Sequence, residues 1–209
     1  VLTQILLNHV VSGTAKSTDL QTGYIKTLAK GGASTTNTLS MYVDLTSGVK
    51  LNGVAKVTTA DVMASNGIIH VVDAVIGLPT IVTHATANPN FSTLATLLTT
   101  QNLISTLSSS ATPSPFTVFA PLNSAFDTAT TSLYGGLTST QKTAVLTYHV
   151  IGGANVLSTG IPASSPTLET GILRFSGATI TDEQARVTNI VLTDVQCSNG
   201  IIHAVNKVL

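Results

Sequence analysis

Apolar residues recur at intervals of three and four between residues 81 and 150, which is the spacing of amphipathic helices. Pro113 and Pro115 interrupt this helical region, and Phe116-Thr-Val-Phe119 is a short β-type run that Pro121 closes. Helical spacing returns over residues 124–130 and 138–149. The pattern therefore predicts several helices with one strand among them.

From residue 150 onward, β-branched residues punctuated by glycines predict strands, most clearly over residues 187–195. Asn199-Gly200 lies between two such runs, and this dipeptide is the strongest short-range signal for a β-hairpin. Because a tight hairpin turn favours positive φ angles, we expect one at Gly200, with the Asn199 side chain bonded to nearby backbone. We expect the same at Gly67 and Asn66.

This pattern occurs twice along the chain. The five residues 66–70 recur unchanged as residues 199–203, within a longer match of residues 54–76 to residues 187–209. Residues 6–13 match residues 146–153, so that nothing at the start of the chain matches residues 81–140. A repeat of this kind indicates two copies of one module. We predict the C-terminal half of a first domain over residues 1–79 and a complete second domain over residues 80–209. The short link Gly77–Ile81 should hold them in a near-fixed orientation.

Composition narrows the class of protein. Hydrophobic residues make up 43% of the chain and charged residues only 9%, whereas ordinary soluble domains carry about 25% charged residues. Ser and Thr make up roughly a quarter of the chain, a surface chemistry that fits an extracellular or cell-surface setting. Nine basic and nine acidic residues cancel without any basic cluster, so we predict no nucleic-acid binding. No apolar run reaches the length of about 18 residues that a membrane-spanning helix needs.

Sequence motifs of catalysis are missing: there is no G-x-S-x-G, H-E-x-x-H, Walker loop or G-x-G-x-x-G. Four of the five histidines form two repeat pairs, His9 with His149 and His70 with His203, which favours a role in the fold that both copies share. A metal site at His149 and His203 would lack a third ligand, so we predict no metal, no cofactor and no enzymatic activity. The single Cys197 replaces an alanine of the first copy and is expected to be a buried apolar residue.

Three segments resemble the landmarks of the fasciclin domain family, in that family's order and spacing. They are FTVFAPLNSAF (Phe116–Phe126), TYHV (Thr147–Val150) and SNGIIHAVNKVL (Ser198–Leu209). The resemblance covers residues 81–209, whereas residues 1–79 resemble only the second half of the domain, with Asn8 in the place of Tyr148. It implies an α+β fold, a fasciclin-like β-sandwich wedge with packed helices, in two copies of which the first is incomplete.

The repeat and the resemblance together predict which residues build the fold rather than a site. They are Phe116, Thr117, Phe119, Pro121, Asn123 and Phe126 in the first landmark, and His9, Asn66, Gly67, His70, Asn199, Gly200 and His203 in the repeated segments. Asn123 follows Pro121 at the start of a helical stretch, where its side-chain oxygen can accept a hydrogen bond from an unpaired N–H.

Fasciclin domains act mostly in cell adhesion and extracellular matrix and share no catalytic activity. The resemblance therefore implies a secreted or cell-surface protein that works by adhesion or self-assembly, forming filaments or matrix. Its expected partners are other copies of itself or other surface proteins and glycans. In some animal members the region of Tyr148 and His149 is implicated in integrin binding, so this pair is a candidate adhesion patch; the alternative is that both residues belong to the core.

The alternative function for this protein is that of a module that binds a small lipid or glycan in a cleft between helices and sheet. That function predicts an apolar pocket with a few polar groups converging on it. Asn90-Phe91-Ser92 is a sequon for N-glycosylation and marks Asn90 as a possible attachment site.

The strands between residues 10 and 76 should carry an apolar face that residues 81–140 cover in the second copy. Soluble proteins avoid large bare apolar faces and open sheet edges, so we expect something to cover this one. Our first expectation is an upstream part of the same polypeptide. The alternative is a segment of a neighbouring molecule, a head-to-tail contact that would build filaments.

Overall fold

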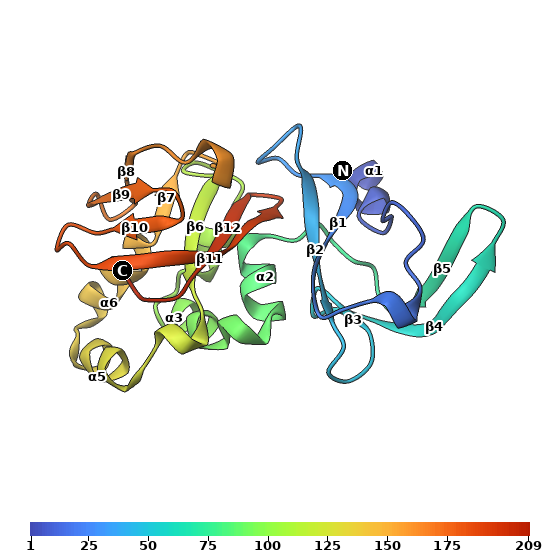
Figure 1. The fold of residues 1–209 in the computed structure, drawn as a ribbon, viewed down its shortest axis with the longest axis horizontal. Helices are drawn as coiled ribbons and strands as arrows, with labels where there is room; N and C mark the ends of the chain where they lie inside the picture. Colours follow the sequence, from blue (N-terminus) through green and yellow to red (C-terminus); the bar gives the residue numbers. More distant parts are fainter.

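The computed structural model describes residues 1–209 and contains two β-sheets, each with its own helices (Figure 1). We call the part with the five-stranded sheet the first unit and the part with the seven-stranded sheet the second unit. The two units match the two copies of the repeat. The prediction of an α+β fold in two copies is therefore confirmed.

The first unit begins with helix α1 (Leu2–Leu7) and the 3-10 turn η1 (Ser17–Asp19). Its strands are β1 (Gly23–Lys30), β2 (Thr38–Asp44), β3 (Lys50–Leu51), β4 (Ala55–Ala64) and β5 (Gly67–Val72). Each strand pairs antiparallel with the next, in the order β1-β2-β3-β4-β5. The β4–β5 hairpin projects away from the rest of the molecule, at the right of Figure 1.

The second unit has its helices mainly before its strands, as the spacing of apolar residues predicted. The helices are α2 (Ile81–Ala87), α3 (Ser92–Thr100), α4 (Ile104–Ser108), α5 (Thr128–Gly136) and α6 (Ser139–Tyr148). Short 3-10 turns are η2 (Pro89–Phe91), η3 (Asn123–Ala125) and η4 (Ser158–Gly160). Side chains of Thr80, Asp127 and Thr138 cap α2, α5 and α6, because each accepts a hydrogen bond from an otherwise unpaired N–H of the first turn.

Seven strands form the sheet of the second unit. They are β6 (Phe116–Pro121), β7 (Val150–Gly152), β8 (Ser164–Pro166), β9 (Ile172–Ser176), β10 (Thr179–Thr181), β11 (Val187–Cys197) and β12 (Gly200–Val205). Their order is β7-β6-β12-β11-β10-β9-β8, and only the β6–β12 pair is parallel. Every residue of β6 and β12 is buried, as expected for a parallel pair covered on both faces.

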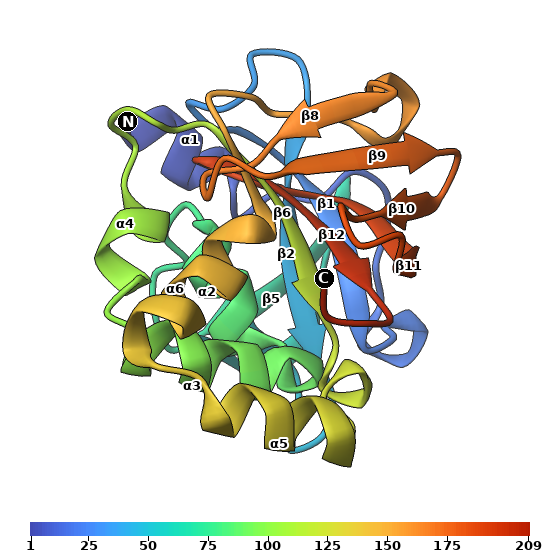
Figure 2. The ribbon, with the colours of Figure 1, turned by 90° about the vertical axis from the view of Figure 1, so that its left-hand side faces the viewer.

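Two apolar clusters cover the two faces of β6 and β12. On one face, Phe91, Leu94 and Leu98 from the helices pack against Val118 and Ile202. On the other face, Phe119 lies among residues of the curled part of the sheet: Ile151, Leu173, Ile180, Ile190, Val205 and Leu209. Figure 2 shows α3, α5 and α6 on one side of β6 and β12 and β8–β10 on the other. Cys197 is fully buried in the first cluster, as predicted, and burial raises the pKa of its thiol.

Both predicted hairpins are present, but the reason given for their glycines is wrong. Gly67 and Gly200 each open the second strand of a hairpin, and neither has a positive φ angle. Gly200 is required for a different reason. A Cβ atom at this position would lie 2.2 Å from the Phe116 carbonyl oxygen, because β6 passes directly beside it.

The two units touch along β2 and β11, which agrees with the near-fixed orientation expected from the short link. The Gln196 N–H donates to Ser40 Oγ at 3.0 Å, and Lys26 Nζ donates to the Asp194 carbonyl at 2.8 Å. Gly31 approaches Ser198 so closely that a Cβ atom would lie 2.4 Å from its Cα. A larger residue at Gly31 would therefore force the units apart.

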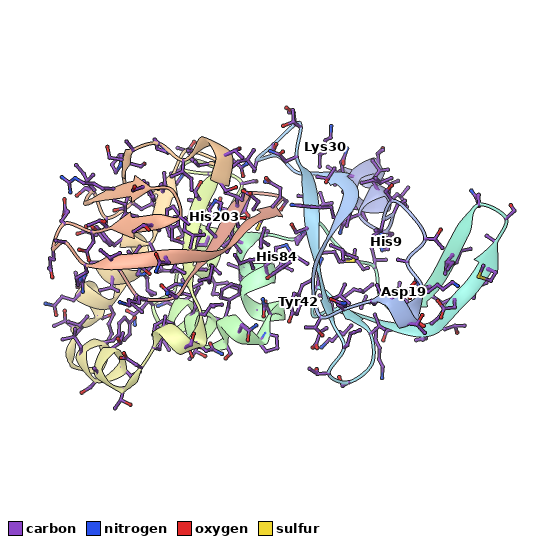
Figure 3. The ribbon with its side chains drawn as sticks, viewed as in Figure 1. His9, Asp19, Lys30, Tyr42, His84 and His203 are labelled. Carbon is purple, nitrogen blue, oxygen red and sulfur yellow. The ribbon has the colours of Figure 1, made fainter.

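Aromatic side chains complete this contact where α2 faces the first unit (Figure 3). The Tyr24 ring meets the His84 ring edge-on, with centroids 5.3 Å apart, and also contacts Tyr42 at 5.1 Å. Asn88 Nδ2 donates to the Tyr24 hydroxyl at 3.2 Å. The contact thus combines polar and aromatic groups from both units.

Candidate functional site

Tyr148 and His149, the predicted adhesion patch, lie at the end of α6 and point to different environments. His149 is only 3% exposed. Its Nδ1–H donates to the Val145 carbonyl at 2.7 Å, and its Nε2 accepts from the Leu209 N–H at 2.9 Å. Both ring nitrogens are thus used inside the protein. Of this pair, only Tyr148 is available to a partner.

Tyr148 is half-buried and borders a shallow surface depression of about 210 Å³. Its hydroxyl accepts from the Glu183 N–H at 3.3 Å and donates to the Ile172 carbonyl at 3.3 Å. The ring covers Gly171, where a Cβ atom would lie 2.5 Å from Tyr148 Cε2. Tyr148 therefore links α6 to β9 and to the loop before β11 while keeping one side toward solvent.

Charged groups surround this depression, which we call the Tyr148 patch (Tyr148, Glu169, Glu183 and Arg186). Glu169 and Glu183 are exposed, and Arg186 pairs with the buried Asp182 carboxylate. Asp182 also accepts hydrogen bonds from the backbone N–H groups of Gln184 and Arg186, both at 2.9 Å, so its charge is well compensated. The carboxylates of Glu169 and Glu183 accept from the N–H groups of Gly171 at 3.3 Å and Ile172 at 3.1 Å, and they give the rim an acidic character suited to a polar partner.

The strand residues of the first fasciclin-like landmark lie inside the second unit. Phe116, Phe119 and Pro121 are buried, and Phe126 is half-buried. Thr117 Oγ1 donates to the Ala154 carbonyl at 2.8 Å and accepts from the Val156 N–H at 2.9 Å. These groups fasten β6 to the segment that follows β7.

Asn123 caps a helix, although not the one that follows it in sequence. Its Oδ1 accepts from the Thr93 N–H at 3.0 Å, at the start of α3, and its Nδ2 donates to the Pro89 carbonyl at 2.8 Å. The N–H that it satisfies is 30 residues away in sequence. The expected local cap is therefore replaced by a tertiary one.

The paired histidines make equivalent hydrogen bonds in both units. His9 repeats the bonds of His149, because its Nδ1–H donates to the Ile5 carbonyl at 2.8 Å and its Nε2 accepts from the Ile76 N–H at 3.0 Å. His70 and His203 both use Nε2–H, which donates to the Ala15 carbonyl at 2.8 Å in one unit and to the Val156 carbonyl at 2.9 Å in the other. Each histidine joins segments that are distant in sequence, which explains why both copies hold it.

Asn66 and Asn199 are identical in sequence but not in their contacts. Asn199 is buried: its Oδ1 accepts from the Ile81 N–H at 3.0 Å, and its Nδ2 donates to the carbonyls of Leu107 and Ser109 at 2.8 and 3.0 Å. These partners belong to or adjoin helices of the second unit, not to the turn itself. Asn66 is exposed and makes no side-chain hydrogen bond, since the first unit has no counterpart of these helices.

No group of three or more His, Cys, Asp or Glu side chains lies close enough together to hold a metal ion. No helix is both long and apolar enough to cross a membrane.

The space between the helices and the sheet of the second unit has a volume of only about 10 Å³ and is lined almost entirely by apolar side chains. This space is too small for a lipid or a glycan.

The largest apolar hollow lies in the first unit. It has a volume of about 440 Å³, and 14 of its 17 lining residues are hydrophobic. Its lining includes Val10 and Val11, Ile68, His70 and Val72 of β5, and apolar residues of β1, β2 and β3. We call this hollow the β5 groove; the cover that we expect over the apolar face of these strands stays a prediction.

Asn90 lies in η2, and its side chain is exposed. The position is open to modification, and glycosylation there stays a prediction.

His84 was not singled out from the sequence, because a single histidine in a helical segment carries no signal of its role. It is fully buried between the two units, and neither ring nitrogen makes a hydrogen bond.

Buried histidines should make the protein less stable in acid. Burial lowers the pKa of His84 to about 3 and the pKa of His149 to about 4. An unfolded histidine titrates at about 6.5, so between these values the unfolded chain binds protons that the folded protein does not. Full stability is therefore present above about pH 6.5 and is lost as the pH falls. Each of the two histidines contributes a slope of up to about 1.4 kcal/mol per pH unit.

The measurement is the unfolding free energy of the chain at a series of pH values from about 7.5 down to about 4.5, for the wild type and for His84→Leu. The variant should show a shallower loss of stability than the wild type. Equal slopes in the two proteins would show that His84 is not held neutral in the folded state.

Comparison with known proteins agrees with this architecture. The fasciclin domain family model matches residues 1–79 and 89–209. "Uncharacterized protein sll1735" of Synechocystis sp. is 34% identical over 138 residues, which are 63% of this chain and 98% of that protein. "Protein sll1483" of the same organism is 31% identical over 136 residues, 62% of this chain and 72% of that protein. The FAS1 domain pair from the insect cell adhesion molecule Fasciclin I has a TM-score of 0.57 and 20% identity, over 99% of this chain and 79% of that chain, and so shares the fold.

Proposed function

Because this chain belongs to the fasciclin domain family, we propose that it is a secreted or cell-surface protein that acts by adhesion or assembly through contacts with other proteins or glycans. The observation that carries the proposal is the pair of fasciclin units joined by direct contacts. The insect protein whose domain pair has the same fold is a cell adhesion molecule. Two units in fixed orientation give an adhesive surface a defined geometry, which lowers the entropy lost on binding.

The Tyr148 patch is the contact surface that we propose for this function. It combines a half-buried aromatic ring with exposed carboxylates. Tyrosine is favoured at protein interfaces because it offers a large rigid surface with one polar end. The carboxylates of Glu169 and Glu183 would select partners that carry positive charge or hydroxyl groups. His149 supports this patch from inside by fixing the end of α6.

A bead assay tests the proposal. Beads coated with the chain should aggregate or bind to surfaces coated with extracellular matrix material, and Glu183→Lys should reduce this binding by at least about fivefold, since a reversed charge repels the same partner. Asp19→Lys is the matched control, because Asp19 is an exposed carboxylate of the first unit that is absent from the patch. Beads that stay dispersed and bind no matrix surface would contradict an adhesive function. Equal losses in both variants would place the contact elsewhere.

A further inference from the structure

A polar hollow lies where the two units meet. It has a volume of about 350 Å³, and only one of its eight lining residues is hydrophobic. We call it the inter-unit groove, and its polar lining includes Lys26, Asn37 and Thr38 of the first unit and Thr159, Asp194 and Gln196 of the second. It shares no residue with the Tyr148 patch. Because both units supply its walls, the groove is a property of the pair and not of one fasciclin unit.

The first unit reaches this groove through a long hairpin. The β1–β2 hairpin spans Gly23–Asp44, whereas its counterpart in strand order, β8–β9, spans only Ser164–Ser176. Its loop lies against the β11–β12 turn, where the Ala33 N–H donates to the Ser198 carbonyl at 2.9 Å (Figure 1). The wall that this hairpin provides is therefore held in place relative to β11.

Lys26 and Asp194 bring opposite charges to the groove without forming an ion pair with each other. Lys26 Nζ donates to Ser40 Oγ at 3.0 Å and to the Asp194 carbonyl at 2.8 Å. An ammonium group has three N–H donors, so one of them is left for a ligand. The Asp194 carboxylate accepts from the N–H and the hydroxyl of Ser158, and about two of its four acceptor sites stay open.

Three more side chains of the lining have polar groups without a partner in the protein. The hydroxyls of Thr38 and Thr159 make no hydrogen bond within the chain. Asn37 Nδ2 donates to Ser34 Oγ at 3.0 Å, whereas its Oδ1 accepts from no other group. The groove therefore presents unused donors and unused acceptors side by side, with one positive and one negative charge among them.

This mixture selects the kind of ligand. An anionic ligand would be repelled by the Asp194 carboxylate, and a cationic ligand by the Lys26 ammonium. An apolar ligand would remove these polar groups from water without pairing them. A sugar hydroxyl both donates and accepts a hydrogen bond, so a neutral ligand with many hydroxyls can pair with both kinds of group.

We propose that the inter-unit groove binds a neutral glycan. Lys26 donates to the glycan, Asp194 and Asn37 accept from its hydroxyls, and the hydroxyls of Thr38 and Thr159 do either. The site adds a glycan to the partners of the proposed adhesive function, at a place separate from the Tyr148 patch.

Binding to polysaccharides tests the proposal. The probes are the neutral polymers dextran, mannan and galactan, each immobilised on a sensor surface over which the full chain flows. The chain should bind at least one of them saturably, with less than about a twofold change in affinity between about 50 and about 500 mM salt, because the ligand carries no charge. Dextran sulfate and diethylaminoethyl-dextran, which are anionic and cationic, should not bind more tightly than the neutral polymer.

The matched variants exchange threonine for valine, which keeps the shape of the side chain and removes its hydroxyl. Thr38→Val combined with Thr159→Val should fold as the wild type does, because neither hydroxyl has a partner in the protein, and should bind the glycan at least about tenfold more weakly. The control combines Thr59→Val with Thr140→Val, since both threonines are exposed, lie outside the groove and make no side-chain hydrogen bond. The control should bind as the wild type does.

Chemical labelling locates the bound polymer. It should slow the acetylation of Lys26 but not that of Lys56, an exposed lysine outside the groove. Glu183→Lys should leave glycan binding unchanged, so that failure of this site and failure of the Tyr148 patch are told apart.

Three results would overturn the proposal: no binding to any of the three neutral polymers, equal weakening in the two double variants, or unchanged labelling of Lys26. Tighter binding of dextran sulfate would replace the neutral glycan with an anionic ligand, and tighter binding of diethylaminoethyl-dextran would replace it with a cationic one.

Discussion

Phe119→Ala is expected to lower the unfolding free energy of the second unit by about 4 kcal/mol, which is typical for removal of a buried phenylalanine. Phe119 is fully buried at the centre of its cluster, stacks on His203 and contacts Phe175 at a centroid distance of 5.3 Å. Its loss removes apolar contacts on every side and leaves a cavity beside β6. This cavity cannot close, because β6 stays hydrogen-bonded to its neighbouring strands. The cavity would resemble the β5 groove of the first unit.

Denaturant unfolding followed by circular dichroism measures this effect. Phe126→Ala is the control, because Phe126 is only half-buried and its removal should cost about 1–2 kcal/mol. Similar losses in the two variants would mean that Phe119 does not hold the curled part of the sheet together.

Gly200→Ala should destabilise the chain by about 3 kcal/mol, whereas Gly67→Ala should change its stability by no more than about 0.5 kcal/mol. The added methyl group at Gly200 would lie 2.2 Å from the Phe116 carbonyl oxygen and 2.9 Å from the Phe116 nitrogen. Backbone atoms cannot rotate away, so β6 must shift along its whole length. At Gly67 the same methyl group would meet nothing within 4 Å.

The two glycines have the same neighbours in sequence and the same place in a hairpin, so the pair isolates the effect of β6. Thermal unfolding of the two variants beside the wild type is sufficient. A large loss in Gly67→Ala would show that this turn needs its glycine for reasons of backbone conformation.

Local patterns in the sequence were enough to place most of the elements. The apolar spacing between residues 81 and 150 predicted the helical region, and Asn199-Gly200 predicted the β11–β12 hairpin, both of which the structure contains. The repeat added long-range information, because identical segments adopt equivalent strands and the paired histidines make equivalent hydrogen bonds. These features depend on residues close in sequence or on comparison of the chain with itself.

The contacts that give individual residues their roles could not be predicted in this way. Gly200 is needed because a strand 84 residues earlier passes beside it, and Asn123 caps a helix through an N–H that lies 30 residues before it. The resemblance left open whether Tyr148 and His149 form an adhesion patch or belong to the core. Successive residues at a helix end point in different directions, and the helix turns His149 inward.

The sequence by itself determined that this protein consists of repeated α+β modules of the fasciclin type, since periodicity and identity between copies are properties of the chain alone. Only the tertiary structure decided which surfaces are open. It placed His84 between the units and exposed one side of Tyr148. The physical reason is that burial depends on which distant segments meet in space, and a pattern of residues along the chain does not contain that information.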